Sequence, residues 1–222
     1  MKIFFNKDNF KLWALFVVSL IIALVVYKDL PEQIPVHWGI KGEVDGWGSR
    51  LFIFLGPAAT LLMIVFAEIR RIDPHKQNYE KFRKPYYTVY FVVSLIFLLI
   101  ELVTIAYVKG IIIDLSVVLS VAIGILFIIM GNVMPKFKHN YFAGIRTSWT
   151  LANEDVWYET HRFGGRVWFI CGILMVVCAF LPTIWKVISV LGGAIGGAIA
   201  STVYSFICYR RIEKEKKENE KI

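Results

Sequence analysis

The chain has 222 residues, 57% of them hydrophobic, with a mean hydropathy of +0.61. Soluble domains contain about 45–50% apolar residues, so this excess excludes a small soluble core. The formal net charge of +8 has an ordinary cause, because the basic residues flank apolar blocks, where anionic lipid headgroups attract them. We therefore expect membrane lipids as partners and no direct contact with nucleic acid.

The apolar residues fall into blocks of about twenty, the length of a helix that crosses about 30 Å of hydrocarbon. They predict an all-α polytopic membrane helical bundle. The first block follows a basic leader, but no small-residue cleavage site follows Val26, so we expect this block to be retained. The six predicted transmembrane helices are Leu12–Tyr27, Leu51–Ile69, Tyr86–Val108, Ile111–Gly131, Val167–Ile184 and Val187–Tyr209.

The positive charges predict the orientation of the bundle. Most of the 25 lysines and arginines lie in the leader, including Lys2, in the second and fourth connections, and in the tail, including Lys221. By the positive-inside rule these parts are cytoplasmic, so both termini are expected in the cytoplasm. The few on the other side are Lys28, Lys41, Arg50, Lys109 and Lys186.

We divide the chain into three parts. Residues 1–70 hold the first two spans and an outer loop (residues 28–50), residues 71–130 hold spans three and four, and residues 131–222 hold an inner loop (residues 131–165), the last two spans and a charged tail. Only these two loops are long enough for structure of their own, so we expect the functional residues in them or where they meet the spans.

The outer loop begins in extended geometry, because Pro31 and Pro35 bias the residues before them away from helix. Its tryptophans, Trp38 and Trp47, suit the headgroup layer and place the loop against the outer leaflet.

Three further outer-loop side chains, His37, Glu43 and Asp45, leave three interpretations open. They form an external cation or proton site, or Asp45 caps a glycine turn while His37 bonds the loop backbone, or they contact an extracellular ligand such as a toxin peptide. One histidine without cysteine is a poor ligand set, so we expect no metal.

Two acids fall in or beside predicted spans. Glu101 lies about 10 Å inside the third span, and Asp114 begins the fourth after a tight turn, so the two carboxylates are expected near each other. Intramembrane acids are costly and often functional, which favours a proton or cation site. The alternative is a Glu101 that is protonated or paired with a hydroxyl such as that of Thr104 or Ser116.

The inner loop contains a helix-start pattern, Asn153 followed by two acids. We expect a short helix along the inner interface that Gly164 and Gly165 end or kink before the fifth span. Arg146 either binds an anionic group or anchors the loop at the interface. His161 is expected to be a hydrogen-bonded interfacial residue.

The last span carries two overlapping frames of small residues, which allow a helix to approach closely. We expect them to pack inside the bundle, with a homodimer as the alternative. The residues are Gly192, Gly193, Gly196 and Gly197.

The two loops together resemble a known family. The outer loop, with Leu30-Pro31, Ile34-Pro35, His37, Gly42 and Asp45-Gly46, resembles a domain of unknown function common in SdpI-type proteins. The inner loop resembles the SdpI domain, although Ser148 replaces a frequent proline. The residues that carry this second resemblance, and would form its site, include Asn132, Asn140, Arg146, Thr147, Trp149, Trp157 and His161.

The resemblance implies a multi-pass protein of the bacterial plasma membrane that confers immunity to a secreted, membrane-active peptide toxin. It also implies a cytoplasmic transcriptional repressor as a second partner, held at the membrane. The alternative from the residues is a small transporter or ion-coupled permease that uses Glu101 and Asp114. No nucleophile with a paired base and no phosphate-binding glycine loop occurs, so we expect neither an enzyme nor a cofactor.

Overall fold

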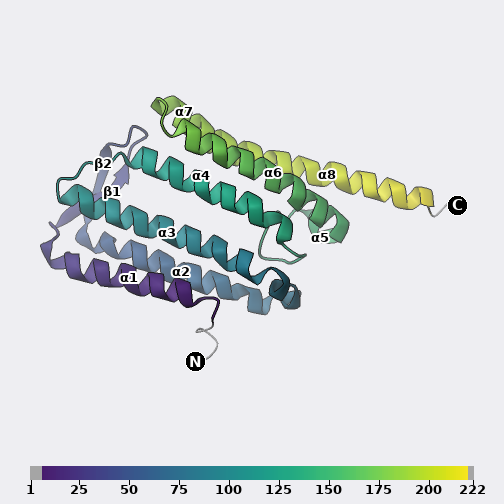
Figure 1. The fold of residues 1–222 in the computed structure, drawn as a ribbon, viewed down its shortest axis with the longest axis horizontal. Coiled ribbons are helices and arrows are strands. Elements are labelled where there is room, and N and C mark those ends of the chain that lie inside the picture. The colour runs from purple at the N-terminus through teal and green to yellow at the C-terminus, as the bar shows by residue number, and fades with distance from the viewer. Residues whose placement is uncertain (1–6, 220–222) are drawn as a thin grey trace.

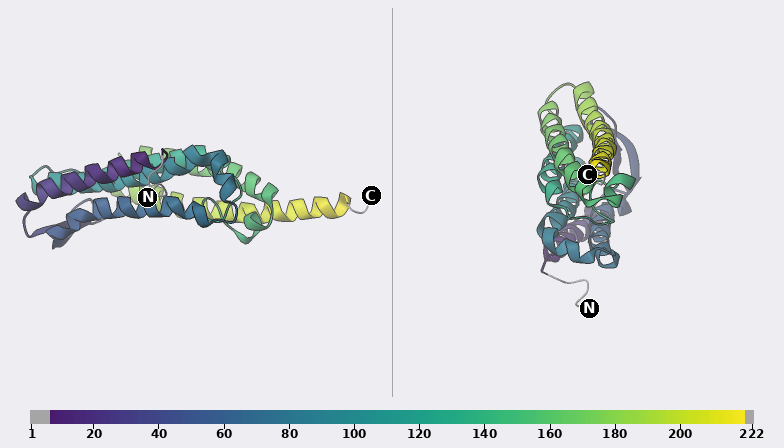
Figure 2. Two further views of the ribbon diagram at one scale, coloured as in Figure 1. Left: turned by 90° about the horizontal axis from the view of Figure 1, so that it is seen from below. Right: turned by 90° about the vertical axis from the view of Figure 1, so that its right-hand side faces the viewer.

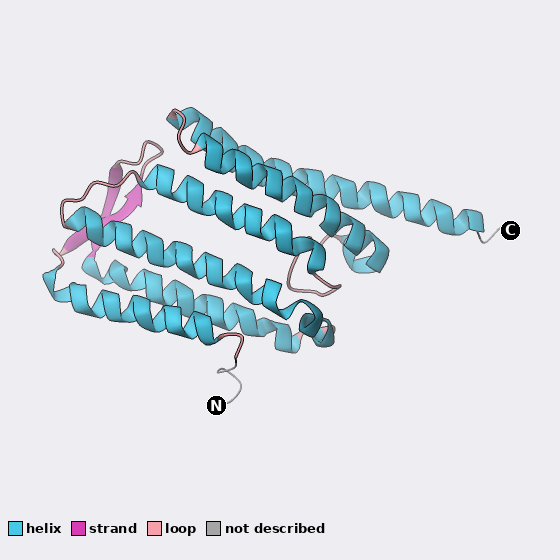
Figure 3. Ribbon diagram, in the orientation of Figure 1, coloured by secondary structure: helices cyan, strands magenta, loops and turns pink. Residues whose placement is uncertain are grey.

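The computed structural model describes residues 7–219, so Lys2 and Lys221 lie outside the described residues. Within this range the regular structure is helical apart from one two-stranded sheet, and loops join the elements (Figures 1 and 3). The elements are α1 (Phe10–Val26), β1 (Gln33–Trp38), β2 (Val44–Ser49), α2 (Leu55–Glu68), α3 (Arg83–Val108), α4 (Leu115–Val133), α5 (Ser148–Ala152), α6 (Glu154–Cys178), α7 (Thr183–Val187) and α8 (Gly193–Asn219), joined by short 3₁₀ turns and, between α7 and α8, a π turn at Ile188–Gly192.

Six helical segments of the described chain are long and apolar enough to cross a membrane, which confirms the predicted all-α bundle with six spans. Each segment overlaps a predicted block. With their flanking turns they run Phe10–Asp29, Arg50–Ile72, Lys76–Val108, Leu115–Lys136, Glu154–Cys178 and Thr183–Asn219.

The long helices pack as two groups of three that lie side by side: α1, α2 and α3 in one, and α4, α6 and α8 in the other (Figure 1). The closest approach joins α4 and α6, where glycines face glycines. A Cβ added at Gly131 would lie 2.6 Å from the Gly165 carbonyl oxygen, and one at Gly172 would lie 2.6 Å from the Gly124 carbonyl oxygen. Small residues of this kind allow membrane helices to touch through their backbones.

Of the two outcomes predicted for the short interfacial helix at Gly164 and Gly165, the end is wrong and the kink stays a prediction. Both glycines lie inside α6, which begins at Asn153 as expected and continues to Cys178. Their role is packing, since Gly165 faces Gly131 and Pro135, while a side chain at Gly164 would meet Ile145. Because α4 and the inner loop fill the space beside them, these glycines allow close packing against α6 and do not end this helix.

The outer loop is a hairpin of antiparallel strands β1 and β2, in which Gln33 pairs with Ser49 and Trp38 with Val44. The extended geometry expected around the prolines is present, but the strand pairing was not predicted. Gly46 lies opposite His37, where an added Cβ would be 2.8 Å from the His37 Cβ. This close approach explains the glycine in an otherwise ordinary strand.

The described chain begins and ends on the same side of the bundle, opposite the hairpin, and α8 extends beyond the other helices there (Figures 1 and 2). We call the hairpin side the outer end and the other side the inner end, following the orientation that the charges predict. The assignment of the inner end to the cytoplasm, and the division into three parts, stay predictions.

Candidate ligand-binding site at the outer end

The hairpin is held by its own polar side chains and turn. His37 Nδ1 and Asp45 Oδ1 are 2.5 Å apart, and both side chains are exposed. The turn closes through bonds from Gly39 N to the Glu43 carbonyl and from Gly42 N to the Gly39 carbonyl. His37 thus bonds a carboxylate rather than the loop backbone. Contact of the hairpin with an extracellular ligand stays a prediction.

The hairpin turn rests on the first residue before α4. Gly42 has a positive φ of 85°, and a Cβ there would lie 2.6 Å from Asp114 Oδ1. Glycine therefore meets both the backbone and the space requirement. Farther along β2, the half-exposed Trp47 packs edge-on against Tyr107 of α3, with ring centroids 6.1 Å apart. These contacts fix the hairpin on the bundle.

Asp114 caps α4 and pairs with a lysine from α7. Its Oδ1 accepts bonds from Ser116 N and Val117 N at 2.9 and 3.2 Å, and its Oδ2 lies 3.2 Å from Lys186 Nζ. Burial acts to raise the Asp114 pKa, but the bonds from Ser116 and Lys186 outweigh it and lower the pKa below its usual 3.8. Asp114 therefore forms a structural ion pair with Lys186, which joins the start of α4 to α7.

This lowered pKa predicts a pH dependence of stability. The charged Asp114 favours the folded state above the ordinary pKa, and this contribution is lost as the pH falls through the lowered value, below about 4. Since the side chain is half exposed, we expect a loss of at most about 1 kcal/mol. Thermal unfolding in detergent at pH 7 and pH 3 measures it. Asp114→Asn should reduce the difference between the two pH values, and an unchanged difference would contradict the assignment.

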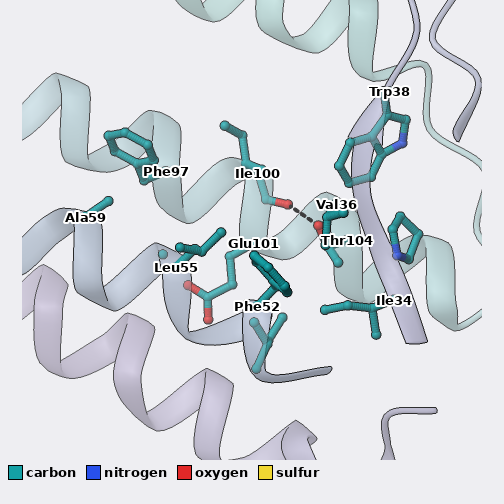
Figure 4. A pocket seen from close by; sticks show the side chains of 13 residues that line it. Ile34, Val36, Trp38, Phe52, Leu55, Ala59, Phe97, Ile100, Glu101 and Thr104 are labelled. Atoms are coloured by element: carbon teal, nitrogen blue, oxygen red, sulfur yellow. Dashed lines mark hydrogen bonds between the residues drawn. The ribbon is translucent and has the colours of Figure 1, made fainter. Parts of the chain in front are cut away.

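Glu101 lies deeper, in the wall of a cavity of about 270 Å³ between the hairpin, α2 and α3. Figure 4 shows Ile34 and Trp38 of β1 on one side of this cavity, and Phe97, Ile100 and Glu101 of α3 across from them. Apolar side chains make most of the wall. The hydroxyl of Thr104 also lines it but donates to the Ile100 carbonyl at 3.0 Å. We call this space the outer cavity.

The partner of Glu101 is Ser19 of α1, whose hydroxyl donates to Oε2 at 2.5 Å. The expected hydroxyls were the wrong ones, since Thr104 bonds its own helix and Ser116 bonds Asp114. Glu101 and Asp114 have different partners, and their approach to each other stays a prediction. Among the described residues, Glu101 Oε1 is buried without a hydrogen-bond partner, and no group of three or more metal-ligating side chains occurs.

The inner end is built around Asn140, which is fully buried. Its side-chain oxygen accepts bonds from Phe142 N and Ala143 N, and its amide donates to the Lys138 and Ala143 carbonyls. Tyr79 donates to Asn140 at 2.9 Å and lies 2.7 Å from Asp73, whose carboxylate also accepts from Tyr141 N. Sequence reasoning missed Asp73 and Tyr79. The hydrogen bonds of Tyr79 to Asp73 and Asn140 form only when the fold brings these residues together.

His161 and Trp157 lock the inner loop onto α6. Ile145 N donates to His161 Nε2 at 3.0 Å, so Nδ1 carries the proton and donates to the Trp157 carbonyl at 2.8 Å. The rings of Trp157 and His161 stack, and Trp157 Nε1 donates to the Phe137 carbonyl at 2.9 Å. Both residues are completely buried, and their polar atoms bond within the fold.

The remaining inner residues of the predicted site make contacts other than those of Trp157 and His161. Thr147 caps α5 and meets Ser205 of α8 at 3.0 Å, and Trp149 packs on Phe206. Asn132 is exposed and donates to a carbonyl of its own helix, that of Ile128. Arg146 is exposed too, and its guanidinium donates to the Tyr141 carbonyl at 2.7 Å. An anionic partner for Arg146 stays a prediction.

The four glycines of the last span divide between two faces. Gly193 and Gly197 face α6, where added Cβ atoms would meet Met175 and Trp168. Gly192 and Gly196 have nothing within 4 Å of an added Cβ among the described atoms. One frame thus packs inside the bundle, and the other faces outward.

Comparison with known proteins supports the resemblance seen in both loops. The sequence model of the SdpI/YfhL protein family matches residues 136–205, and that of a domain of unknown function, DUF1648, matches residues 14–61. Residues 136–205 are thus similar to the SdpI/YfhL family. It is 24% identical to the immunity protein SdpI of Bacillus subtilis (strain 168), in an alignment covering 88% of this chain and 92% of that protein. No solved structure matches it significantly.

The comparison with known proteins and the six long helices both indicate a membrane protein. Six membrane-crossing helices and an SdpI homologue make this a multi-pass bacterial membrane protein. The SdpI match covers most of the inner loop, α6, α7 and the first half of α8, whereas the DUF1648 match covers most of α1, the hairpin and the start of α2. The outer cavity therefore has walls from the DUF1648 segment and from α3.

Proposed function

We propose that this protein confers immunity to a secreted, membrane-active peptide toxin, which it binds at the outer end. The observation that supports this most is the similarity to an immunity protein over most of both chains. The structure adds a suitable surface, since the hairpin exposes Glu43 and Trp47 and its first strand lines a largely apolar cavity. Such a surface can receive an amphipathic peptide that lies in the outer leaflet.

The geometry favours binding over transport. Glu101 and Asp114, the two acids that a coupled permease would use, have separate structural partners, Ser19 and Lys186. We therefore assign the outer end a receptor surface.

Protection can be tested by removing the two exposed side chains of the hairpin. We expect Glu43→Ala combined with Trp47→Ala to lower the toxin concentration that kills the cell by about tenfold, as loss of a binding anchor does. The assay compares a deletion strain complemented with wild type or variant at equal membrane abundance, challenged with the peptide against which the relative protects or with medium from the native host. Unchanged sensitivity after deletion of the gene itself would overturn the proposal.

A second, signalling role is proposed for the inner end, where a cytoplasmic repressor would bind. Three side chains are exposed there, those of Tyr141, Phe142 and Arg146. Their backbone is held by the buried Asp73 and Asn140, which accept bonds from Tyr141 N and Phe142 N, and Arg146 donates to the Tyr141 carbonyl. Arg146 combined with two aromatics suits an acidic, partly apolar protein surface.

Alanine at Tyr141 and Arg146 separates the two roles. We expect this variant to keep toxin protection and to lose recruitment of the repressor, because neither side chain lies near the hairpin. Membrane fractionation of the tagged repressor, before and after toxin exposure, measures recruitment. Loss of protection in this variant at normal abundance would show that the two ends do not act separately.

A further inference from the structure

The outer cavity has a chemical character that points to one kind of ligand. Three aromatic side chains, Trp38, Phe52 and Phe97, line it together with aliphatic ones, and Glu101 supplies its acid. None of the residues that line it is basic. At about 270 Å³ it is just below the roughly 300–1,000 Å³ of pockets for drug-sized molecules, so it has room for a single side chain.

Glu101 lacks a partner that this space could provide. The residue is 4% exposed, Ser19 serves Oε2, and Oε1 has no hydrogen-bond partner within the described part of the chain. A buried oxygen left unpaired costs about 1–3 kcal/mol. Protonation would remove the charge of the carboxylate. It would add an O–H donor to Glu101 itself, but Oε1 would still have no hydrogen-bond partner. A ligand that donates hydrogen bonds would satisfy it.

The packing also holds Glu101 at the cavity rather than away from it. Gly56 of α2 lies against the carboxyl group so closely that any Cβ at this position would collide with Oε2. The rim is formed by Phe52 and Leu55, which are 47% and 56% exposed at the outer part of the bundle. A group that lies in the outer leaflet can therefore enter past these two side chains.

We propose that the outer cavity binds a primary ammonium group on an apolar chain, as carried by a lysine side chain of the toxin peptide. The ammonium group donates to Glu101 Oε1, the methylene chain contacts the apolar wall, and the aromatic faces add cation–π attraction. A metal ion does not fit, because Glu101 is the one carboxylate in the lining and hard cations need several oxygen ligands. The assignment to the toxin rests on the proposed function; the binding of an alkylammonium group does not.

The test uses the full-length protein in detergent and n-hexylammonium chloride as the probe. Ligand that binds only the folded state raises the unfolding temperature, and at about 100 times its Kd the gain in free energy is about 2.7 kcal/mol. We expect a saturable rise in the wild type with n-hexylammonium and none with n-hexanol, which has the same chain without the charge. Equal shifts with both compounds would overturn the proposal.

Two variants locate the site. Glu101→Gln should abolish the shift, and so should Ala59→Leu, which fills the cavity from α2 and leaves the carboxylate in place. Ala58→Leu is the matched control, because Ala58 is the exposed neighbour on the same helix and does not line the cavity. If Glu101→Gln fails to fold, Ala59→Leu still decides, and a full response in it contradicts the site.

The protection assay then separates the two proposals. Loss of the amine response with intact protection in Ala59→Leu cells would show that the cavity is not the toxin subsite, while immunity stands. Amine binding to a protein whose gene deletion leaves sensitivity unchanged would overturn immunity and leave the ammonium site standing.

Discussion

Gly165→Ala should lower the free energy of unfolding by about 1–3 kcal/mol, although alanine is a better helix former than glycine by about 1 kcal/mol. The added Cβ would lie 2.8 Å from the Gly131 carbonyl oxygen and about 3 Å from the ring of Pro135. These are backbone and ring atoms that cannot rotate away, so α4 and α6 must separate. Titration with denaturing detergent, followed by circular dichroism, measures the change.

Gly196→Ala is the matched control on α8. Nothing described lies within 4 Å of its added Cβ, so the same chemical change should be neutral or stabilise by about 0.4–1 kcal/mol through the unfolded chain. Opposite signs for the two variants would establish that contact between α4 and α6, rather than helix propensity, decides the outcome. A Gly165→Ala protein as stable as Gly196→Ala would contradict the packing described.

The spans could be predicted because their signal is local. Apolar length and flanking charge identify a membrane helix without knowledge of its neighbours, and all six predicted spans are present. The end predicted at Gly164 and Gly165 failed because a glycine pair inside a helix pattern has two opposite uses. Only the presence of Gly131 across the interface decides between them.

The candidate site depended on contacts between distant parts of the chain. Ser19 and Glu101 are 82 residues apart, and Lys186 lies 72 residues from Asp114, so spacing along the sequence could not pair them. For the hairpin, likewise, the extended geometry was predicted from the sequence, but the pairing of β1 with β2 was not. A signal was present for Ser19, since a hydroxyl in an apolar span is a ready partner for a buried acid.

The inner residues that carry the family resemblance are of two kinds. Asn140, Trp157 and His161 are buried and use their polar atoms on the loop backbone, whereas Arg146 is exposed. The buried part of the predicted site thus serves the fold, and binding by its exposed residues stays a prediction. The buried part holds the exposed part of the loop in one conformation, which is what a docking surface for a cytoplasmic partner requires.

Trp157→Ala should be among the most destabilising single changes in the protein, lowering the free energy of unfolding by about 3–5 kcal/mol. The ring is completely buried, stacks on His161 and belongs to the largest apolar cluster, which also holds Tyr79, Phe82 and Phe137. Trp157→Phe keeps most of the volume but leaves the Phe137 carbonyl without its donor, for an expected loss of about 1–3 kcal/mol.

Trp185→Ala provides the comparison, since Trp185 is 52% exposed at the outer end and its loss should change stability by less than about 1 kcal/mol. The order of stability should be wild type and Trp185→Ala, then Trp157→Phe, then Trp157→Ala. If Trp157 served a partner instead of the fold, its variants would unfold like the wild type and fail only in repressor recruitment. Because the tryptophan donates to the inner loop, we expect both stability and recruitment to fall together, with recruitment restored in Trp157→Phe at low temperature.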